Sequence, residues 1–381
     1  MADDLTWTAS PADLLRPGPD FDLATFDRGG TPGFDGDKDD GKALTAERGL
    51  LLSELQERLF AEGRSGGERS VLLVLQGLDT AGKGGIVRHV MGMVDPQGID
   101  LHSFGVPTEE EKRHNYLWRI RRALPRPGRI GVFDRSHYED VLVARVDELV
   151  EEEVWRKRYA EINRFERTVA SRGTTIVKVA LMVSKQEQGL RLLERLDRPD
   201  KHWKFNPNDV TTRKKWDDYQ EAYADVFART NTDVAPWHVI PADKKWYARL
   251  AVTELVTQAL IDMNPRWPRP RWRVATQTAA LLRTMDPDNV PTDEEREETV
   301  EETLADEREF AEALAEVAAS SADPQDAADE QDAKDTKKDD KKDKDKDKKS
   351  KKDKKKDDDD KPSEKKKDKK KDGKKKKKKD D

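Results

Sequence analysis

The sequence of 381 residues contains no cysteine, and none of its apolar runs approaches the ~18 residues of a membrane-spanning helix. Disulfide bonds and cysteine-ligated zinc sites are therefore excluded. The N-terminus includes Asp3 and Asp4 and lacks an apolar segment of signal-peptide length. We therefore expect a cytoplasmic protein that makes no membrane contact.

Apolar residues are also scarce in residues 321–381, where 27 Lys and 21 Asp or Glu leave a net charge of +6. Such a segment cannot bury enough apolar surface to offset its chain entropy, and we predict a disordered low-complexity tail. Because the whole chain carries −6, residues 1–320 carry −12. An acidic body and a tail of mixed sign argue against binding of a specific nucleic acid. Cationic residues that bind an anion would have to be gathered locally.

Apolar runs of strand length alternate with helical patterns between residues 42 and 275. Continuous apolar strands suit a parallel sheet with both faces covered. We therefore predict an α/β fold, a three-layer sandwich around a mainly parallel five-stranded sheet. The expected strands are 70–76, 99–106, 129–133, 174–183 and 237–240, and the expected helices are 42–61, 86–94, 109–124, 151–172, 185–196, 209–230 and 244–263, with Asp209 as an N-cap.

Two segments flank this predicted domain of residues 42–275. Residues 1–41 are rich in Pro, Gly and Asp, and we expect an irregular N-terminal arm. Residues 276–320 are acidic, and Thr292 and Glu295 have the spacing of a capping box. This second segment is either a peripheral acidic helix or a solvated linker.

A glycine-rich segment, Gly77-Leu-Asp-Thr-Ala-Gly-Lys83-Gly-Gly85, stands between the first predicted strand and a helix. This is the context of a P-loop, in which backbone N–H groups and the helix N-terminus bind phosphate while the lysine adds positive charge. A plain β–α turn is the alternative, and the coincidence of strand, spacing, lysine and a downstream strand-end aspartate disfavours it. The predicted phosphate-binding residues of the loop are Gly77, Thr80, Ala81, Gly82, Lys83, Gly84 and Gly85.

The residue after Lys83 is Gly84, where a P-loop usually carries a Ser or Thr that binds magnesium. Metal binding must then depend on carboxylates. Asp79 lies inside the loop, and Asp134 follows the apolar residues of the third predicted strand. We therefore predict an Mg²⁺ site formed by Asp79 and Asp134.

Arg135 comes directly after this predicted metal ligand. An arginine there can bind phosphate oxygens through two parallel hydrogen bonds, whereas the alternative is a salt bridge to Asp134 or Glu139. We expect His137 to pack or to form hydrogen bonds rather than to act as a base, because phosphoryl transfer depends mostly on positioning and charge neutralisation.

Two clusters of cationic residues fit a long polyanion. The first lies between residues 112 and 135 and includes Arg119 and Arg122. The second contains Arg191, Arg195, Arg198, Lys201 and Lys204. Its arginines have a helical spacing that places them on one face, and a mobile basic helix within residues 184–215 would act as a lid that excludes water. The alternative is a solvated helix face paired with Glu187 and Glu194. Most aromatic residues between 203 and 247 are expected to pack in the core.

With these motifs in place, the chain resembles polyphosphate kinase family 2. The matching segments are Leu75–Lys83, His114–Arg119, Phe133–Glu139, Asp200–Phe205 and Ala235–Pro241, and the resemblance covers roughly residues 5–275. It implies a P-loop kinase fold with a helical lid, magnesium dependence and a homo-oligomer. It also implies phosphoryl transfer between inorganic polyphosphate and a nucleoside mono- or diphosphate, and the Ser-His-Tyr-Glu segment looks like the subgroup that accepts both AMP and ADP.

The resemblance also implies roles for individual residues. Catalytic roles are expected for Asp79, Lys83, Asp134, Arg135, Arg191 and Arg195, nucleotide binding for Arg119, Arg122 and Glu139, and further phosphate binding for Lys201 and Lys204. Gly84 and Arg198 depart from the residues expected at their positions. The expected reaction is in-line attack of a nucleotide phosphate oxygen on the end phosphorus of polyphosphate. An ATP-dependent nucleotide or small-molecule kinase and a non-catalytic P-loop nucleotide-binding protein are the alternatives.

Overall fold

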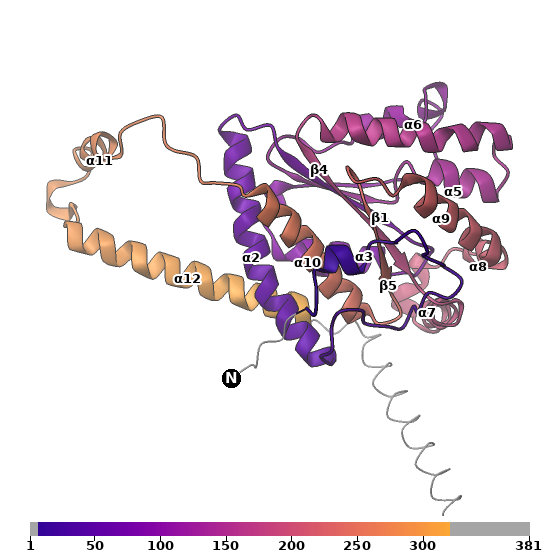
Figure 1. The fold of residues 1–381 in the computed structure, drawn as a ribbon. Helices are drawn as coiled ribbons and strands as arrows, with labels where there is room; N and C mark the ends of the chain where they lie inside the picture. The colour runs from indigo at the N-terminus through magenta and orange to yellow at the C-terminus, as the bar shows by residue number, and fades with distance from the viewer. Residues whose placement is uncertain (1–6, 321–381) are drawn as a thin grey trace, which may run out of the picture. The chain divides into compact units, whose positions relative to one another are not determined.

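The five strands form one parallel sheet in the order β2-β3-β1-β4-β5, which confirms the predicted α/β fold (Figure 1). The computed structural model describes residues 7–320, with side chains for residues 7–315, so the predicted tail of residues 321–381 lies outside the described part. The strands are β1 Ser70–Gln76, β2 Ile99–Ser103, β3 Ile130–Asp134, β4 Thr174–Met182 and β5 Trp237–Pro241. All seven residues of β1 are buried, as expected for a central strand covered on both faces.

Helices cover both faces of the sheet. Because successive strand residues point to opposite faces, Val71, Leu73 and Leu75 of β1 join one core cluster, while Leu72 and Val74 join the other. The first cluster is completed by α2 Lys38–Arg64, α3 Lys83–His89 and α10 Lys245–Met263. The second is completed by α4 Leu117–Arg122, α5 Glu139–Val146, α6 Glu152–Ala170 and α9 Trp216–Thr230.

Two predicted long helices are each broken into two. The segment 109–124 forms the 3₁₀ turn η3 Glu111–Arg113 and then α4, whose N-cap is Tyr116. Just before α4, the Asn115 side chain accepts the backbone N–H of Leu117 at 3.0 Å, a local bond that favours a turn there. The segment 209–230 forms α8 Asn208–Lys214 and then α9. The prediction of Asp209 as an N-cap was wrong, because Pro207 occupies that position and Asp209 lies in the first turn of α8.

The remaining elements lie at the ends of the chain and in the connections. Within the N-terminal arm, Pro11–Leu14 forms the short helix α1, and Leu15 and Phe34 are buried in the first core cluster. The other elements are α7 Lys185–Asp197, α11 Val274–Leu282, α12 Asp293–Ser320 and the 3₁₀ turns η1 Met91–Met93, η2 Pro96–Gly98, η4 Pro199–Lys204 and η5 Pro287–Asn289.

The capping box predicted at Thr292 is present at the start of α12. The backbone N–H of Thr292 donates to Glu295 Oε2 at 2.7 Å, and the N–H of Glu295 donates to Thr292 Oγ1 at 3.2 Å. The acidic segment is therefore helical from Asp293 and contacts α2 (Figure 1). Over residues 7–320, no helix combines the length and apolarity that crossing a bilayer requires.

Candidate active site

The loops after β1 and β3 leave the sheet side by side. β1 and β3 are neighbouring parallel strands, with Leu75 opposite Asp134. From β1 the sheet extends to β3 and β2 on one side and to β4 and β5 on the other, and crevices at such switch points bind ligands in open α/β sheets. The predicted phosphate loop and the segment from Asp134 to Glu139 therefore meet at one edge.

The phosphate loop adopts a backbone that only glycine accepts at its first position. Gly77 has φ of 152°, and a Cβ there would lie 2.7 Å from the carbonyl oxygen of Leu181. Thr80 has a left-handed φ of 67° although it carries a side chain. Lys83 is buried, and its Nζ donates to the carbonyl oxygens of Gly77 at 2.6 Å and Leu78 at 3.2 Å. The lysine charge is thus held inside the loop.

Asp79 and Arg135 link the two loops. Arg135 Nη2 donates to Asp79 Oδ1 at 2.8 Å, from a residue whose own φ is 64°. Burial alone would raise the pKa of the Asp79 carboxyl. The nearby charges of Lys83 and Arg135, with a smaller contribution from Arg195, outweigh burial and lower this pKa below its ordinary value. The aspartate is therefore ionised at neutral pH and faces several cations.

A pocket of about 420 Å³ opens beside this pair. Its lining residues come from both loops, from α7 and from the segment after α7: Asp79, Arg135, Arg195, Trp203, Lys204, Phe205, Asn206, Pro207 and Asp209. Arg195 Nη1 lies 3.6 Å from Asp209 Oδ2 and donates to the carbonyl oxygen of Lys204 at 3.2 Å. Segments 60 residues apart in the sequence therefore bring Arg135 and Arg195 to one cavity.

The three arginines expected on one face of α7 have different surroundings. Only Arg195 lines the pocket. Arg191 is buried and donates to the carbonyl oxygens of Thr80 at 3.0 Å and of Ala242 and Asp243 at 2.8 Å, while its Nε pairs with Glu187 at 2.7 Å.

Arg198 lies at the end of the helix and pairs with Glu194 at 3.1 Å and Asp200 at 2.7 Å. The ion pairs with Glu187 and Glu194 that we considered as the alternative are thus present for Arg191 and Arg198.

The predicted nucleotide-binding arginines do not line this pocket. Arg119 is buried and donates to the carbonyl oxygen of Gly105 at 2.8 Å, and the guanidinium of Arg122 lies 4.8 Å from the ring centre of Trp118. Lys201 lies 3.6 Å from Asp200, also outside the lining.

Glu139 begins α5 next to the Asp79–Arg135 pair. Burial raises the pKa of its carboxyl above the ordinary value, although the charges of Arg135 and Lys83 act in the opposite direction.

The chemistry of the available donors suits a metal ion that also binds the substrate. Asp79 and Asp134 supply carboxylate oxygens, and the charges of both act on Arg135. Among the described residues, no group of three or more His, Cys, Asp or Glu side chains is placed to hold a metal ion. Mg²⁺ commonly takes one or two protein carboxylates, with phosphate oxygens and water completing its coordination.

Several residues of the site had not been identified from the sequence. Trp203 lines the pocket although most aromatic residues near it are buried, and 78% of its surface is exposed. Gln188 is buried, and its Nε2 donates to the carbonyl oxygen of Asp79 at 3.3 Å. The motif Asp200–Phe205 could have pointed to Trp203 as a site residue. Gln188 is a single glutamine within a helix, and no sequence pattern marks it as part of the site.

Comparison with known proteins finds a matching family model and similar sequences. A family model described as Polyphosphate kinase 2 matches residues 35–268. An AMP/ADP-polyphosphate phosphotransferase from Meiothermus ruber is 46% identical over 256 residues, which are 67% of this chain and 94% of that protein. An ADP-polyphosphate phosphotransferase from Rhodopseudomonas palustris is 42% identical over 229 residues, covering 57% of this chain and 78% of that one.

A solved structure supports the same relationship. The crystal structure of a polyphosphate kinase 2 from Arthrobacter aurescens is 51% identical in sequence, with a TM-score of 0.71. The match covers 73% of this chain and 98% of that chain. The family model alone spans more than half of the sequence. The chain belongs to the polyphosphate kinase 2 family.

Proposed function

We propose that the protein transfers a phosphoryl group between inorganic polyphosphate and a nucleoside mono- or diphosphate. The observation that carries this proposal is the pocket where Asp79 and Arg135 from two adjacent loops meet Arg195 from α7, beside the buried Lys83. A cavity with this many cationic groups suits a polyanion. The activities named for the relatives from Meiothermus ruber and Rhodopseudomonas palustris support the same substrates.

The proposed step is an in-line displacement at phosphorus. A terminal phosphate oxygen of the nucleotide forms a bond to the end phosphorus of polyphosphate, while the bridging P–O bond breaks and leaves a shortened chain. No covalent enzyme intermediate is needed. Run backwards, the same step lengthens polyphosphate from a nucleoside triphosphate. The protein contributes by positioning the two anions and by neutralising charge that develops on the transferred group.

Lys83, Arg135 and Arg195 are the cations that we assign to this neutralisation. In the structure they are bound to protein oxygens, with Lys83 on loop carbonyls and Arg135 on Asp79. Phosphate oxygens would accept further N–H groups of these side chains, since a guanidinium has five donors and an ammonium three. Protein partners thus hold the cations near the site before substrate arrives, which limits the reorganisation that binding requires.

We assign the metal site to Asp79 and Asp134, which would hold Mg²⁺ together with substrate phosphates. When bound, the ion neutralises phosphate charge and polarises the transferred group. We also propose phosphate binding by Lys204, which lines the pocket, and by Lys201 nearby. The expectations of nucleotide binding by Arg119, Arg122 and Glu139, of a lid within residues 184–215, and of a cytoplasmic homo-oligomer are kept as parts of the proposal.

The proposal is tested by measuring nucleotide products from AMP and from ADP with polyphosphate as the donor. Substitution Lys83→Ala should abolish turnover, because it removes the cation inside the phosphate loop, while circular dichroism shows an intact fold. Lys157→Ala is the matched control, since that lysine is exposed on α6 and pairs with Glu153 at its surface. Activity of Lys83→Ala within a few-fold of wild type would reject the proposed site. Turnover with ATP and no polyphosphate would favour an ordinary kinase.

A further inference from the structure

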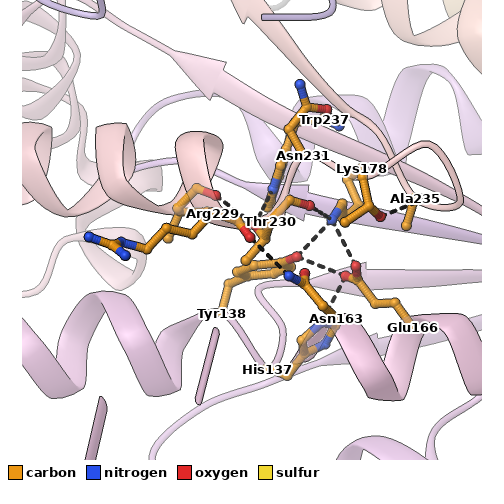
Figure 2. Close-up of polar contacts among 12 residues, drawn as sticks. His137, Tyr138, Asn163, Glu166, Lys178, Arg229, Thr230, Asn231, Ala235 and Trp237 are labelled. Carbon is orange, nitrogen blue, oxygen red and sulfur yellow. Dashed lines mark hydrogen bonds and ion pairs between the residues drawn. The ribbon is translucent and has the colours of Figure 1, made fainter. Parts of the chain in front are cut away.

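A buried ion pair lies at the centre of a hydrogen-bond network that includes His137 and Tyr138 from the loop after β3 (Figure 2). Lys178 in β4 is fully buried. Its Nζ donates to Glu166 Oε2, to Tyr138 Oη and to the carbonyl oxygen of Thr230, each at 2.8 Å. A lysine ammonium has three N–H donors, and all three are therefore used inside the core.

The partners of Lys178 are themselves fully bonded. The Tyr138 hydroxyl donates to Glu166 Oε1 at 2.8 Å, and the same oxygen accepts His137 Nε2 at 3.2 Å. Trp237 Nε1 donates to Thr230 Oγ1 at 2.9 Å. Within this buried cluster of His137, Tyr138, Glu166, Lys178, Thr230 and Trp237, only His137 Nδ1 has no partner.

The energetics of a buried ion pair argue against a role for this cluster in stability alone. Burial would raise the pKa of the Glu166 carboxyl, but the Lys178 charge and the hydrogen bond from His137 outweigh it and lower that pKa, while burial lowers the pKa of the Lys178 ammonium. The distances of 2.8 Å from Lys178 Nζ to Glu166, Tyr138 and Thr230 fit an ion pair. Moving two charges from water into the protein core costs about as much free energy as their mutual attraction recovers. A protein with apolar residues of similar volume in their place is often as stable. What an ion pair with directed hydrogen bonds adds is a defined geometry for the groups it holds.

The group that the buried cluster holds is the turn of residues 134–139. Arg135 in this turn has a left-handed φ of 64°, which its surroundings must maintain. Gln76 Nε2 at the end of β1 donates to Ser136 Oγ at 3.0 Å, and the backbone N–H of Tyr138 donates to the same oxygen at 3.2 Å. Tyr138 immediately precedes Glu139, the first residue of α5. The tyrosine hydroxyl therefore anchors the far end of the turn to β4 and α6.

We propose that Tyr138, Glu166 and Lys178 are positioning residues for phosphoryl transfer, which hold the turn of residues 134–139 so that Arg135 faces the pocket. The inference rests on the proposed function and deepens it, because it adds the groups that orient a catalytic arginine. None of the three lines the pocket, and they act through Arg135.

The test is a double-mutant cycle between Tyr138→Phe and Arg135→Ala. The phenylalanine removes one buried oxygen and keeps the ring, so kcat should fall by roughly ten- to a hundredfold with little change in KM, as for a small misplacement of a catalytic group. In the Arg135→Ala background, Tyr138→Phe should change kcat by less than about twofold, because the residue through which it acts is gone. Additive losses, or an unchanged kcat in folded Tyr138→Phe, would overturn the proposal.

Two further variants separate positioning from stability. Glu254→Gln removes the charge from the partly buried ion pair with Arg48, whose Nε lies 2.7 Å from Glu254 Oε2, in the helical layer on the other face of the sheet. It should lower the melting temperature without changing kcat. The double variant Lys178→Met/Glu166→Leu removes both charges and should reproduce the kcat loss. If neither this variant nor Tyr138→Phe folds, the cluster is structural and the proposal is wrong. Absence of polyphosphate-dependent turnover in the wild-type protein would instead refute the proposed function.

Discussion

Thr80 and Arg135 both have left-handed backbone conformations although each carries a side chain, and they stand in the two loops that meet at the pocket. Such a conformation costs on the order of 1–2 kcal/mol for a residue other than glycine. Hydrogen bonds hold both positions, since Arg191 donates to the carbonyl oxygen of Thr80 and the N–H of Arg135 donates to the carbonyl oxygen of Leu75. Strain maintained by surrounding contacts is characteristic of functional loops.

His238 in β5 makes the stability of the fold depend on pH. Burial lowers the pKa of its imidazole to about 4, and its Nδ1 lies 3.1 Å from the carbonyl oxygen of Lys178. As the pH falls from 6.5, the ordinary pKa of a histidine, towards 4, the imidazole of the unfolded chain binds a proton, whereas the imidazole of the folded chain stays neutral. The free energy of unfolding should therefore fall by about 2–3 kcal/mol between roughly pH 7.5 and pH 4.5 because of this residue.

Urea denaturation of the wild-type protein and of His238→Asn at several pH values checks this expectation. Asparagine keeps a donor for the Lys178 carbonyl but does not titrate, so the difference between the two curves isolates the histidine. The wild-type protein should lose more stability than the variant on acidification. Parallel curves over the same pH range would contradict the assignment.

At the scale of elements, α7 connects the phosphate loop to the pocket. Arg191 fastens the helix to the Thr80 carbonyl and to the loop after β5, while Arg195 one turn later reaches the pocket. The helix therefore cannot move as a whole without breaking the bonds of Arg191. If the lid predicted for residues 184–215 closes on substrate, we expect the movement to begin beyond Arg191.

Substitution of two arginines of this region tests the assignment of Arg195. Arg195→Ala should lower kcat/KM with polyphosphate by roughly tenfold or more, because it removes a cation that lines the pocket. Arg198→Ala removes the same side chain from a position paired with Glu194 and Asp200, and it should change kcat/KM by less than about twofold. Steady-state kinetics of both variants over a range of polyphosphate concentrations provides the comparison. Equal losses in the two variants would show that charge near the site matters and the pocket position does not.

At the scale of the whole molecule, the elements that build the site are complete before residue 275. The sheet, both helical layers and α7 precede α11, and the family model ends at residue 268. Beyond this point, α12 contacts α2, where Glu57 and Glu307 bring like charges together. Burial, with a further contribution from Glu307, raises the pKa of the Glu57 carboxyl.

A chain that ends after residue 275 should therefore fold and keep kcat within about twofold of the full chain, with only the contacts of α12 lost. Turnover with polyphosphate and a thermal melt measure the two effects. A chain that ends after residue 320 keeps α12 and lacks only residues 321–381, so it separates the two segments. Loss of folding in the shorter chain alone would place α12 inside the domain, against the predicted boundary at 275.

Much of the fold could be predicted from the sequence because its signals are local. The apolar run Ser70–Gln76, the glycines after it and the β-branched run from Thr174 each specify their own element through burial and backbone freedom. The breaks before α4 and at Lys215 between α8 and α9 were missed, because the apolar pattern continues across both of them. α5 was also missed, since it is short and directly follows the turn after β3.

The sequence by itself determined the strand–loop–helix order, the glycine turn with Lys83 and the cationic residues available to bind an anion. Only the tertiary structure distinguished Arg195 in the pocket from Arg191 in the core, and revealed Lys178 and Glu166 as the support behind Arg135. The physical reason is the distance along the chain over which each kind of signal acts. Burial patterns and turn preferences act over a few neighbouring residues, whereas the partner of a charge depends on which strands and helices the completed sheet brings together.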